Sequence, residues 1–206
     1  MGLNMDLNSS KVLNLRFKGN RRYIAGTDIY NSVNLLSSIF TGKPSSYVSR
    51  LVFRAFAYHD CDICIHNLNE TRKIIATGTI ADNAGTETPF WIFESDRAVN
   101  ERYEFNESLI TSSSYIHETC ISITHETGFT AIENFISLSK KLNYHLYPNI
   151  LGKWVFGQLD LYRPFSDHYD MLSVQLKSAF RNQFTVSNLY QNNVNIGEIR
   201  FIVGQP

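Results

Sequence analysis

Two stretches of the sequence place acid–base groups directly before an expected helix. In the first stretch, Asp28 follows Gly26. In the second stretch, His125 and Glu126 precede Gly128. A carboxylate can act as a general base or as a nucleophile toward a thioester, and an imidazole beside a carboxylate can exchange protons near neutral pH. Asp28 equally suits a first-turn helix acid, and the His125–Glu126 pair equally suits an exposed loop.

Each stretch also supplies backbone groups suited to binding a carbonyl. The first amides of a helix have no partner within the helix, and they carry a partial positive charge. Such groups can polarise a thioester carbonyl or stabilise an oxyanion. Gly26 and Gly128 have no side chain and would let a substrate approach this backbone closely. Both helix starts are therefore candidate carbonyl-binding sites.

Side chains near the first stretch extend this candidate site. Tyr23 and Tyr30 could donate a phenol hydroxyl, or they could line a half-buried surface. Arg21 and Arg22, together with Lys18, form the tightest basic cluster of the chain. This cluster suits either the phosphates of a ligand or a solvated basic turn.

Helical periodicity positions both sets of groups. Residues 131–142 place apolar side chains on one face, with Thr130 as the N-cap and Glu133 as its capping-box partner. We expect Glu133 to cap this helix rather than to catalyse. The upstream helix is expected to have Thr27 or Asp28 as its N-cap.

Alternation of apolar and polar residues predicts strands through the rest of the chain, so the fold class is α+β. The longest strand spans residues 48–66 and places Asp60 and Asp62 on its polar face. Asn192 and Asn193 are typical of a hairpin turn. The other expected strands are 12–17, 73–80, 89–94, 115–123, 153–162, 172–181, 183–190 and 197–203, with a polar connector at 95–114.

The two halves match when the sequence is aligned with itself at an offset of 103 residues. Thr27 then meets Thr130 in the two helices, and Phe53 meets Phe156 in the strands that follow. One offset that serves two kinds of element predicts an internal duplication.

This duplication would divide the chain into units at 1–103 and 104–206, packed as one pseudo-dimeric domain. It also reverses the buried face of the strand at 153–162. A β-bulge at Gly157 would shift the alternation by one residue and restore the buried face. Without such a bulge, Asp160 would point toward the helix.

The segment from His59 to His66 has the spacing of a metal site, because two residues separate Cys61 from Cys64. A zinc knuckle needs a turn that brings both sulfur atoms to one point. This segment has the pattern of a continuous strand, on which the two cysteines point to opposite faces. We therefore expect no metal site.

The composition indicates a folded globular protein and excludes several functions. Of the 206 residues, 43% are hydrophobic, and the net charge at pH 7 is zero. A neutral chain is unsuited to broad electrostatic binding of nucleic acid. No apolar run approaches the roughly 20 residues that span a membrane, and the first residues do not read as a signal peptide. Three cysteines form no disulfide framework, so we expect a cytoplasmic protein.

A strand, a central helix and a run of antiparallel strands, occurring twice, resemble two copies of the hotdog fold. Residues 27–31, Thr-Asp-Ile-Tyr-Asn, resemble the Asp-containing start of the central helix in hotdog thioesterases. His125, Gly128 and Glu133 resemble the His, the Gly and the helix-borne acid of hotdog dehydratases. The resemblance implies a double hotdog, in which antiparallel sheet wraps around two central helices.

The same resemblance implies an enzyme that acts on an acyl thioester by hydrolysis, dehydration or acyl transfer. The acyl group would be carried on coenzyme A or on the phosphopantetheine of an acyl carrier protein, without a further cofactor. A homodimer is compatible with this fold. The candidate catalytic residues are Asp28, His125, Glu126 and Tyr23. The candidate substrate-binding residues are Gly26, Ile29, Tyr30, Gly128, Phe129, Arg21 and Arg22.

Two other classes of function remain open. The same fold could bind an acyl chain or a small ligand without catalysis. It could also serve as a structural or interaction protein of a biosynthetic complex.

Overall fold

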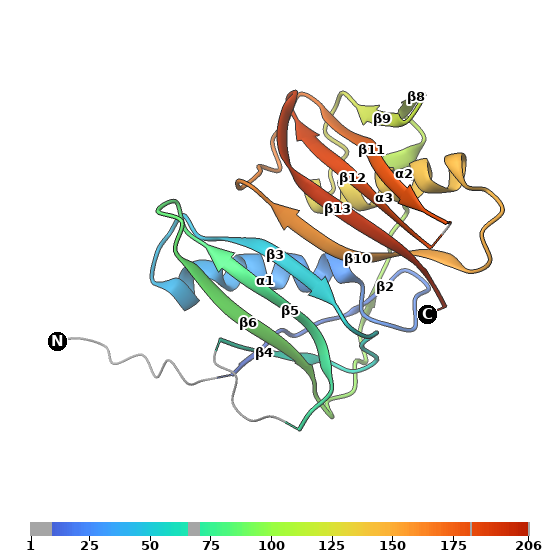
Figure 1. Cartoon of the computed structure of the whole chain (residues 1–206). Helices are drawn as coiled ribbons and strands as arrows, with labels where there is room; N and C mark the ends of the chain where they lie inside the picture. The colour runs from blue at the N-terminus through green and yellow to red at the C-terminus, as the bar shows by residue number, and fades with distance from the viewer. Residues whose placement is uncertain (1–9, 66–70, 182, 206) are drawn as a thin grey trace. The chain divides into compact units, whose positions relative to one another are not determined.

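Two helices of 16 residues each, α1 (Gly26–Thr41) and α3 (Ala131–Leu146), form the centres of the two halves of the chain. The computed structural model describes residues 10–65, 71–181 and 183–205 (Figure 1). The chain divides into two compact units, Met1–Tyr103 and Glu104–Pro206. Each unit contains one of the two helices and antiparallel strands of its own.

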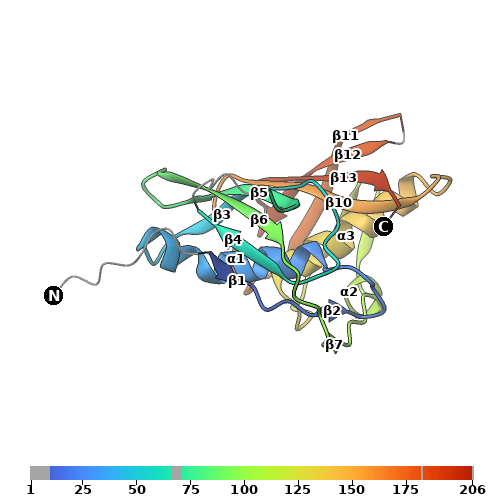
Figure 2. The same ribbon diagram turned by 90° about the horizontal axis from the view of Figure 1, so that it is seen from below.

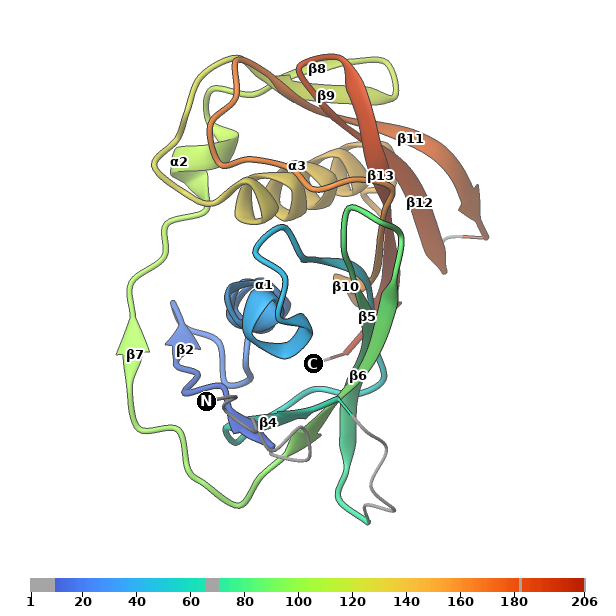
Figure 3. The ribbon, with the colours of Figure 1, turned by 90° about the vertical axis from the view of Figure 1, so that its left-hand side faces the viewer.

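In the first unit, α1 lies inside the curve of an antiparallel sheet (Figure 3). The strands of this sheet are β1 (Lys11–Val12), β3 (Tyr47–Phe53), β4 (Cys61–Cys64), β5 (Ile74–Ala81) and β6 (Glu87–Glu94). They follow the order β1-β4-β6-β5-β3. The inner face of α1 buries Ile29 and Val33 completely, at 1% and 0% exposure. Two short strands, β2 (Phe17–Lys18) and β7 (Arg102–Tyr103), form a separate parallel pair.

In the second unit, α3 lies against one face of a longer sheet, whose strands β11, β12 and β13 run side by side (Figure 2). The strands are β8 (Tyr115–His117), β9 (Cys120–Ile123), β10 (Lys153–Leu161), β11 (Leu172–Phe180), β12 (Phe184–Gln191) and β13 (Val194–Gly204). Their order is β10-β13-β12-β11-β9-β8. A short helix, α2 (Ser108–Thr111), precedes them. On α3 the fully buried apolar side chains are Ala131, Ile132, Phe135, Leu138 and Leu142.

A long helix enclosed by an antiparallel sheet is the hotdog fold, and the chain contains two such units, as expected for a double hotdog. The two sheets differ in one respect. In the first unit the last strand, β6, lies between β4 and β5. In the second unit the last strand, β13, lies between β12 and β10. The order of elements along the chain is therefore shared, whereas the pairing of the last two strands is exchanged.

Three of the expected strands are interrupted. The expected strand at 12–17 breaks because Asn14 adopts a left-handed conformation, with φ at 53°. The expected strand at 48–66 separates into β3 and β4, with residues 54–60 between them as a loop. The expected strand at 115–123 folds back at Glu118, where φ is 50°, into the β8–β9 hairpin. His66 and the first nine residues lie outside the described residues.

Two local features of the second unit agree with the sequence analysis. The register of β10 against β13 shifts between Phe156 and Gln158, so of the two alternatives for this strand the structure has the bulge at Gly157. The bulge keeps Trp154 before it and Leu159 after it buried, at 3% and 0% exposure. The turn between β12 and β13 consists of Asn192 and Asn193, whose φ angles are 50° and 65°. These angles suit the two-residue hairpin turns that favour asparagine.

The residue-by-residue match of the halves does not extend to Phe53 and Phe156. Phe53 is the last residue of β3 and is half-buried, whereas Phe156 lies within β10 and is 9% exposed. The internal duplication itself stays a prediction.

Candidate functional site

The start of α1 is built differently from the sequence expectation. Neither Thr27 nor Asp28 is the N-cap, because the helix begins at Gly26 and Ala25 occupies the N-cap position without a side-chain hydrogen bond. The Thr27 hydroxyl turns instead to two charged neighbours. It accepts a hydrogen bond from Lys18 Nζ at 3.0 Å and donates one to Asp28 Oδ1 at 3.1 Å. Thr27 is therefore part of a polar cluster rather than a cap.

The Asp28 carboxylate is the centre of this cluster. Its Oδ1 atom lies 3.4 Å from Lys18 Nζ, and its Oδ2 atom accepts a hydrogen bond from Tyr103 Oη at 2.7 Å. The side chains of Lys18 and Asp28 are only 2% and 12% exposed. Lys18 Nζ also lies 5.8 Å from the centre of the Tyr103 ring. A buried ammonium therefore faces a carboxylate that also accepts hydrogen bonds from two hydroxyl groups.

The parallel pairing of β2 with β7 brings Lys18 and Tyr103 to the helix start. The Arg102 guanidinium holds the pair together, because it donates hydrogen bonds to the carbonyl oxygens of Gly19 and Arg21. It also stacks on the Phe17 ring at 5.2 Å. The sequence shows no local pattern for this arrangement. From the sequence, Lys18 is expected in a basic turn, and Tyr103 is expected in the polar connector at 95–114.

The first backbone amides of α1 retain donor capacity. The amide of Asp28 donates to the carbonyl oxygen of Ala25 at 3.0 Å. Within residues 10–65, 71–181 and 183–205, the structure records no acceptor for the amides of Gly26 and Thr27. Such amides are suited to a carbonyl oxygen or an anion.

The other sequence candidates of the first unit differ in burial and in contacts. The Tyr23 ring packs edge-on against Phe56, with ring centres 4.9 Å apart. Ile29 and Tyr30 are buried at 1% and 3% exposure, so they belong to the interior rather than to a half-buried surface. The two candidate phosphate-binding side chains differ: Arg21 is half-buried and Arg22 is exposed.

Side chains of the protein already form hydrogen bonds with the first amides of α3. Thr130 and Glu133 form the expected capping box, in which each side chain bonds the other residue's backbone amide. The amide of Ala131 donates to Asp167 Oδ1 at 2.6 Å. The helix continues to Leu146, four residues beyond the expected end at 142. The candidate carbonyl-binding amides of the second unit are therefore already used in part within the protein.

His125 and Glu126 do not form a pair. His125 Nε2 lies 3.0 Å from the Ser113 hydroxyl oxygen, whereas Glu126 Oε1 lies 3.1 Å from His168 Nδ1. The four side chains are at exposed positions. The backbone makes a turn at the nearby Gly128, whose φ is 78°.

Sequence reasoning missed a buried amide beside the start of α3. Asn134, with 0% exposure, donates to Tyr169 Oη at 3.0 Å and accepts from the Thr127 hydroxyl at 2.7 Å. Burial raises the pKa of the Tyr169 phenol. Phe129, another substrate-binding candidate, packs its ring edge-on against Phe105 at 5.2 Å. These contacts tie the helix start to the loop before it.

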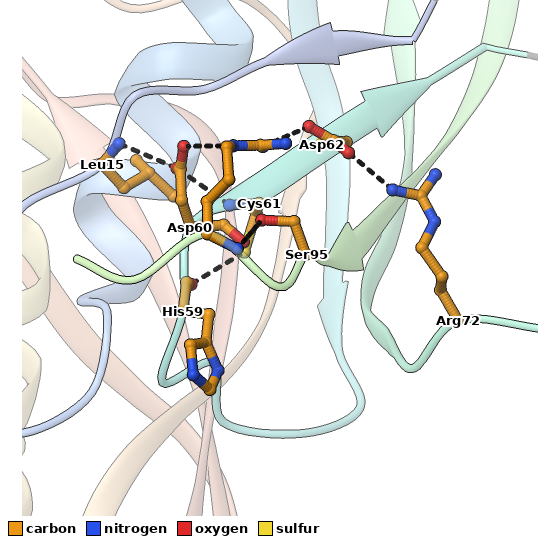
Figure 4. A network of polar contacts seen from close by, with 8 residues as sticks. Leu15, His59, Asp60, Cys61, Asp62, Arg72 and Ser95 are labelled. Carbon is orange, nitrogen blue, oxygen red and sulfur yellow. Dashed lines mark hydrogen bonds and ion pairs between the residues drawn. The ribbon is translucent and has the colours of Figure 1, made fainter.

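A second polar cluster lies in the first unit around Asp60 and Asp62, which were expected on an exposed strand face. Both residues are only 6% exposed. Asp60 accepts a hydrogen bond from the amide of Leu15, and Asp62 faces Arg72 (Figure 4). Arg97 bridges the two carboxylates. These ion pairs make the burial of two neighbouring carboxylates tolerable.

Cys61 and Cys64, from the segment with metal-like spacing, are both buried free thiols. Burial and the nearby carboxylates, chiefly burial, raise the pKa of Cys61 to about 12. A thiol of this kind is a poor nucleophile and a poor metal ligand at neutral pH.

Comparison with known proteins gives likenesses of structure only. No known family profile and no curated protein matches the sequence. The tesB protein of Mycobacterium avium subspecies paratuberculosis matches with 10% identity and a TM-score of 0.47, over 91% of this chain and 89% of its own. An acyl-ACP thioesterase from Bacteroides thetaiotaomicron matches with 9% identity and a TM-score of 0.47, over 96% and 98%. The dehydratase domain of PpsC from Mycobacterium tuberculosis matches with 8% identity and a TM-score of 0.48, over 88% and 85%. Likenesses at this level assign no activity to the chain.

In the part of the chain that the structure describes, no helix is both long enough and apolar enough to span a membrane.

Proposed function

We propose that the chain is an enzyme that processes an acyl thioester at the start of α1. The observation that carries this proposal is the cluster of the buried Lys18 with the half-buried Asp28 and Tyr103, at a helix start without a side-chain cap. Ionisable groups held in a buried, hydrogen-bonded arrangement are costly to fold, and they are often found at functional sites. The hotdog fold of the unit implies the acyl thioester, by analogy of fold.

Asp28 is the proposed general base. Among the described residues, its Oδ1 atom accepts hydrogen bonds from Lys18 and Thr27, whereas its Oδ2 atom accepts one hydrogen bond, from Tyr103. A carboxylate has about four acceptor positions, so Oδ2 can still accept a hydrogen bond from a water molecule. The Lys18 ammonium, 3.4 Å from Oδ1, holds the carboxylate at the helix start.

The proposed reaction is hydrolysis. The thioester carbonyl oxygen accepts hydrogen bonds from the amides of Gly26 and Thr27, which stabilise the negative charge that develops on it. Asp28 takes a proton from the attacking water as the oxygen of that water bonds to the carbonyl carbon. The thiolate then leaves as the carbon–sulfur bond breaks, and it takes up the proton from Asp28.

One working site is proposed, in the first unit. The start of α3 is capped by Thr130 and Glu133, and Asp167 accepts a hydrogen bond from the amide of Ala131. His125 and Glu126 contact other partners at exposed positions, which disfavours them as a catalytic pair. Arg21 and Arg22 are proposed to bind phosphates of the carrier, which is coenzyme A or an acyl carrier protein.

Acyl binding without turnover is the second candidate function. It is favoured by one observation, which is that three protein donors already form hydrogen bonds with Asp28. In such an arrangement the cluster would fix the helix start, and the amides of Gly26 and Thr27 would only hold the ligand carbonyl.

Thermal unfolding with a panel of coenzyme A thioesters of different chain length tests binding. A ligand that binds the folded state raises the melting temperature by mass action. We expect a rise with at least one thioester and a smaller rise in the Arg21→Ala/Arg22→Ala variant. Arg163→Ala, at an exposed position of the second unit, serves as the matched control. A melting temperature unchanged by every thioester would contradict the proposal, and binding without turnover would favour the second candidate.

A further inference from the structure

Three buried side-chain atoms of the second unit lack a hydrogen-bond partner among the described residues. They are the amide nitrogen Nδ2 and oxygen Oδ1 of Asn143 and the indole nitrogen Nε1 of Trp154. Asn143 is 1% exposed and Trp154 is 3% exposed. Folded proteins nearly always pair buried polar atoms, because an unpaired one keeps the full cost of losing water.

Both residues lie where α3 ends and β10 begins. Asn143 lies in the last turn of the helix, and its carbonyl oxygen accepts a hydrogen bond from the amide of Tyr147, the C-cap, at 2.8 Å. The ring of Tyr147 lies 6.1 Å from the ring of Trp154, the second residue of β10. Tyr147 therefore contacts both the backbone of Asn143 and the ring of Trp154.

A neighbouring polar group on the same helix already has a hydrogen-bond partner. The hydroxyl of Ser139, four residues before Asn143, donates to the carbonyl oxygen of Phe135 at 2.7 Å. It is thus bonded back to its own helix, and it gives its proton to neither Asn143 nor Trp154.

We propose that Asn143 and Trp154 form a buried binding site for a hydroxyl group. The Asn143 amide nitrogen and the Trp154 indole nitrogen each need an acceptor, and the Asn143 oxygen needs a donor. A hydroxyl oxygen offers two lone pairs and one proton, so a single hydroxyl group satisfies all three atoms. A carboxylate has no proton for Asn143 Oδ1, and an ammonium has no lone pair for the two nitrogens.

Two sources can supply this hydroxyl group. One is a buried water molecule, which in proteins typically makes about three hydrogen bonds to otherwise unpaired groups. The other is the alcohol group of a small organic ligand held between α3 and β10. The site lies in the second unit, so it does not depend on the thioester chemistry proposed for Asp28.

Nuclear magnetic resonance on the ¹⁵N-labelled full chain tests the site. The chain has two tryptophans, Trp91 and Trp154. Their indole signals can be assigned with the Trp154→Phe variant. We expect the Trp154 indole proton to show a cross-peak to a long-lived water or to a bound ligand. The cross-peak itself is measured on the parent protein.

The Asn143→Leu variant provides the second measurement. If a hydroxyl group bridges the two side chains, this change shifts the Trp154 indole signal, leaves the Trp91 signal in place and lowers the melting temperature. Native mass spectrometry of the intact protein separates the sources, because an organic alcohol adds mass that survives desalting and exchanged water does not. The site is disproved if the Trp154 indole proton shows no cross-peak to water or ligand, or if Asn143→Leu leaves the Trp154 indole signal in place.

Discussion

The ammonium nitrogen of Lys18 lies 3.4 Å from the Asp28 carboxylate oxygen Oδ1, with the two side chains only 2% and 12% exposed. Most charged pairs lie at the surface, where they contribute little to stability. In a buried pair each charge depends on the other, since neither can return to water while the protein stays folded. The pair therefore links the stability of the first unit to its proposed chemistry.

Removing one charge of this pair should be costly. Lys18→Met leaves the Asp28 carboxylate buried without its cation, so we expect a loss of about 3–5 kcal/mol in the free energy of unfolding. Chemical denaturation measures it. Lys140→Met is the matched control, because Lys140 pairs with Glu107 at 2.7 Å while both side chains remain about 30% exposed. The control should lose at most about 1 kcal/mol.

A double-mutant cycle sharpens this test. Combining Lys18→Met with Asp28→Asn removes both charges, so the double variant should be more stable than the sum of the two single losses predicts. Additive losses would show that the two side chains do not act as a pair.

Helix capping gives a second prediction, in which two threonines behave differently. Thr130→Ala removes a capping box and should cost about 1 kcal/mol, and Thr130→Ser should retain most of the stability. Thr27→Ala removes no cap, and its effect arises through Lys18 and Asp28. In the Lys18→Met background Thr27→Ala should therefore cost less than in the parent, whereas Thr130→Ala should cost the same in both.

The contrast between these two threonines shows what local sequence can predict. Thr130 and Glu133 lie three residues apart, and every atom of the capping box is set by that spacing. The Asn192–Asn193 turn is equally local, because the backbone conformation that asparagine tolerates selects the turn.

The α1 cluster could not be predicted in this way. Tyr103 reaches Asp28 only through the pairing of β2 with β7, two strands of two residues each, which are too short to leave a pattern. The burial of Asp60 depends on Arg97, which alternation within residues 48–66 does not reveal. Ion pairs between distant segments thus allow residues of the expected polar face to be buried.

The hairpin turn of the second unit gives a third prediction. Asn193 has φ at 65°, a conformation that glycine adopts without strain, so Asn193→Gly should raise the free energy of unfolding by up to about 1 kcal/mol. Asn192→Gly should lower it, since Asn192 Oδ1 accepts the amides of Asp170 and Met171 at 2.9 Å and 3.0 Å. Thermal unfolding should show a higher melting temperature for Asn193→Gly and a lower one for Asn192→Gly. Equal changes in the two variants would contradict these separate roles of the two asparagines.

Stability should fall in acid partly because of Glu94. Burial acts to raise its pKa, but hydrogen bonds from Lys73 and from the amides of Tyr58 and His59 outweigh burial and lower the pKa below 4.5. A carboxyl group with a lowered folded-state pKa contributes stability that is present above about pH 4.5 and is lost as the pH falls below it. Glu94→Gln should reduce stability at pH 7 and flatten the stability profile between pH 5 and pH 3. Glu87→Gln, at an exposed position of the same strand, should leave the profile unchanged.

The two helix starts should differ in catalysis. If Asp28 is the general base, Asp28→Asn should lower the turnover number by about 10²-fold or more. His125→Ala should leave turnover near the parent value, because His125 contacts Ser113 at an exposed position and Glu126 is bonded to His168.

Because Asp28→Asn also disturbs the buried pair with Lys18, its turnover must be measured below its own melting temperature. Tyr103→Phe helps here, since it removes one hydrogen bond to Asp28 while keeping the Lys18–Asp28 pair. We expect it to change turnover more than it changes thioester affinity. Loss of turnover in His125→Ala with full activity in Asp28→Asn would move the site to the second unit. Full turnover and full thioester affinity in all three variants would leave Asp28, Tyr103 and His125 as structural groups only.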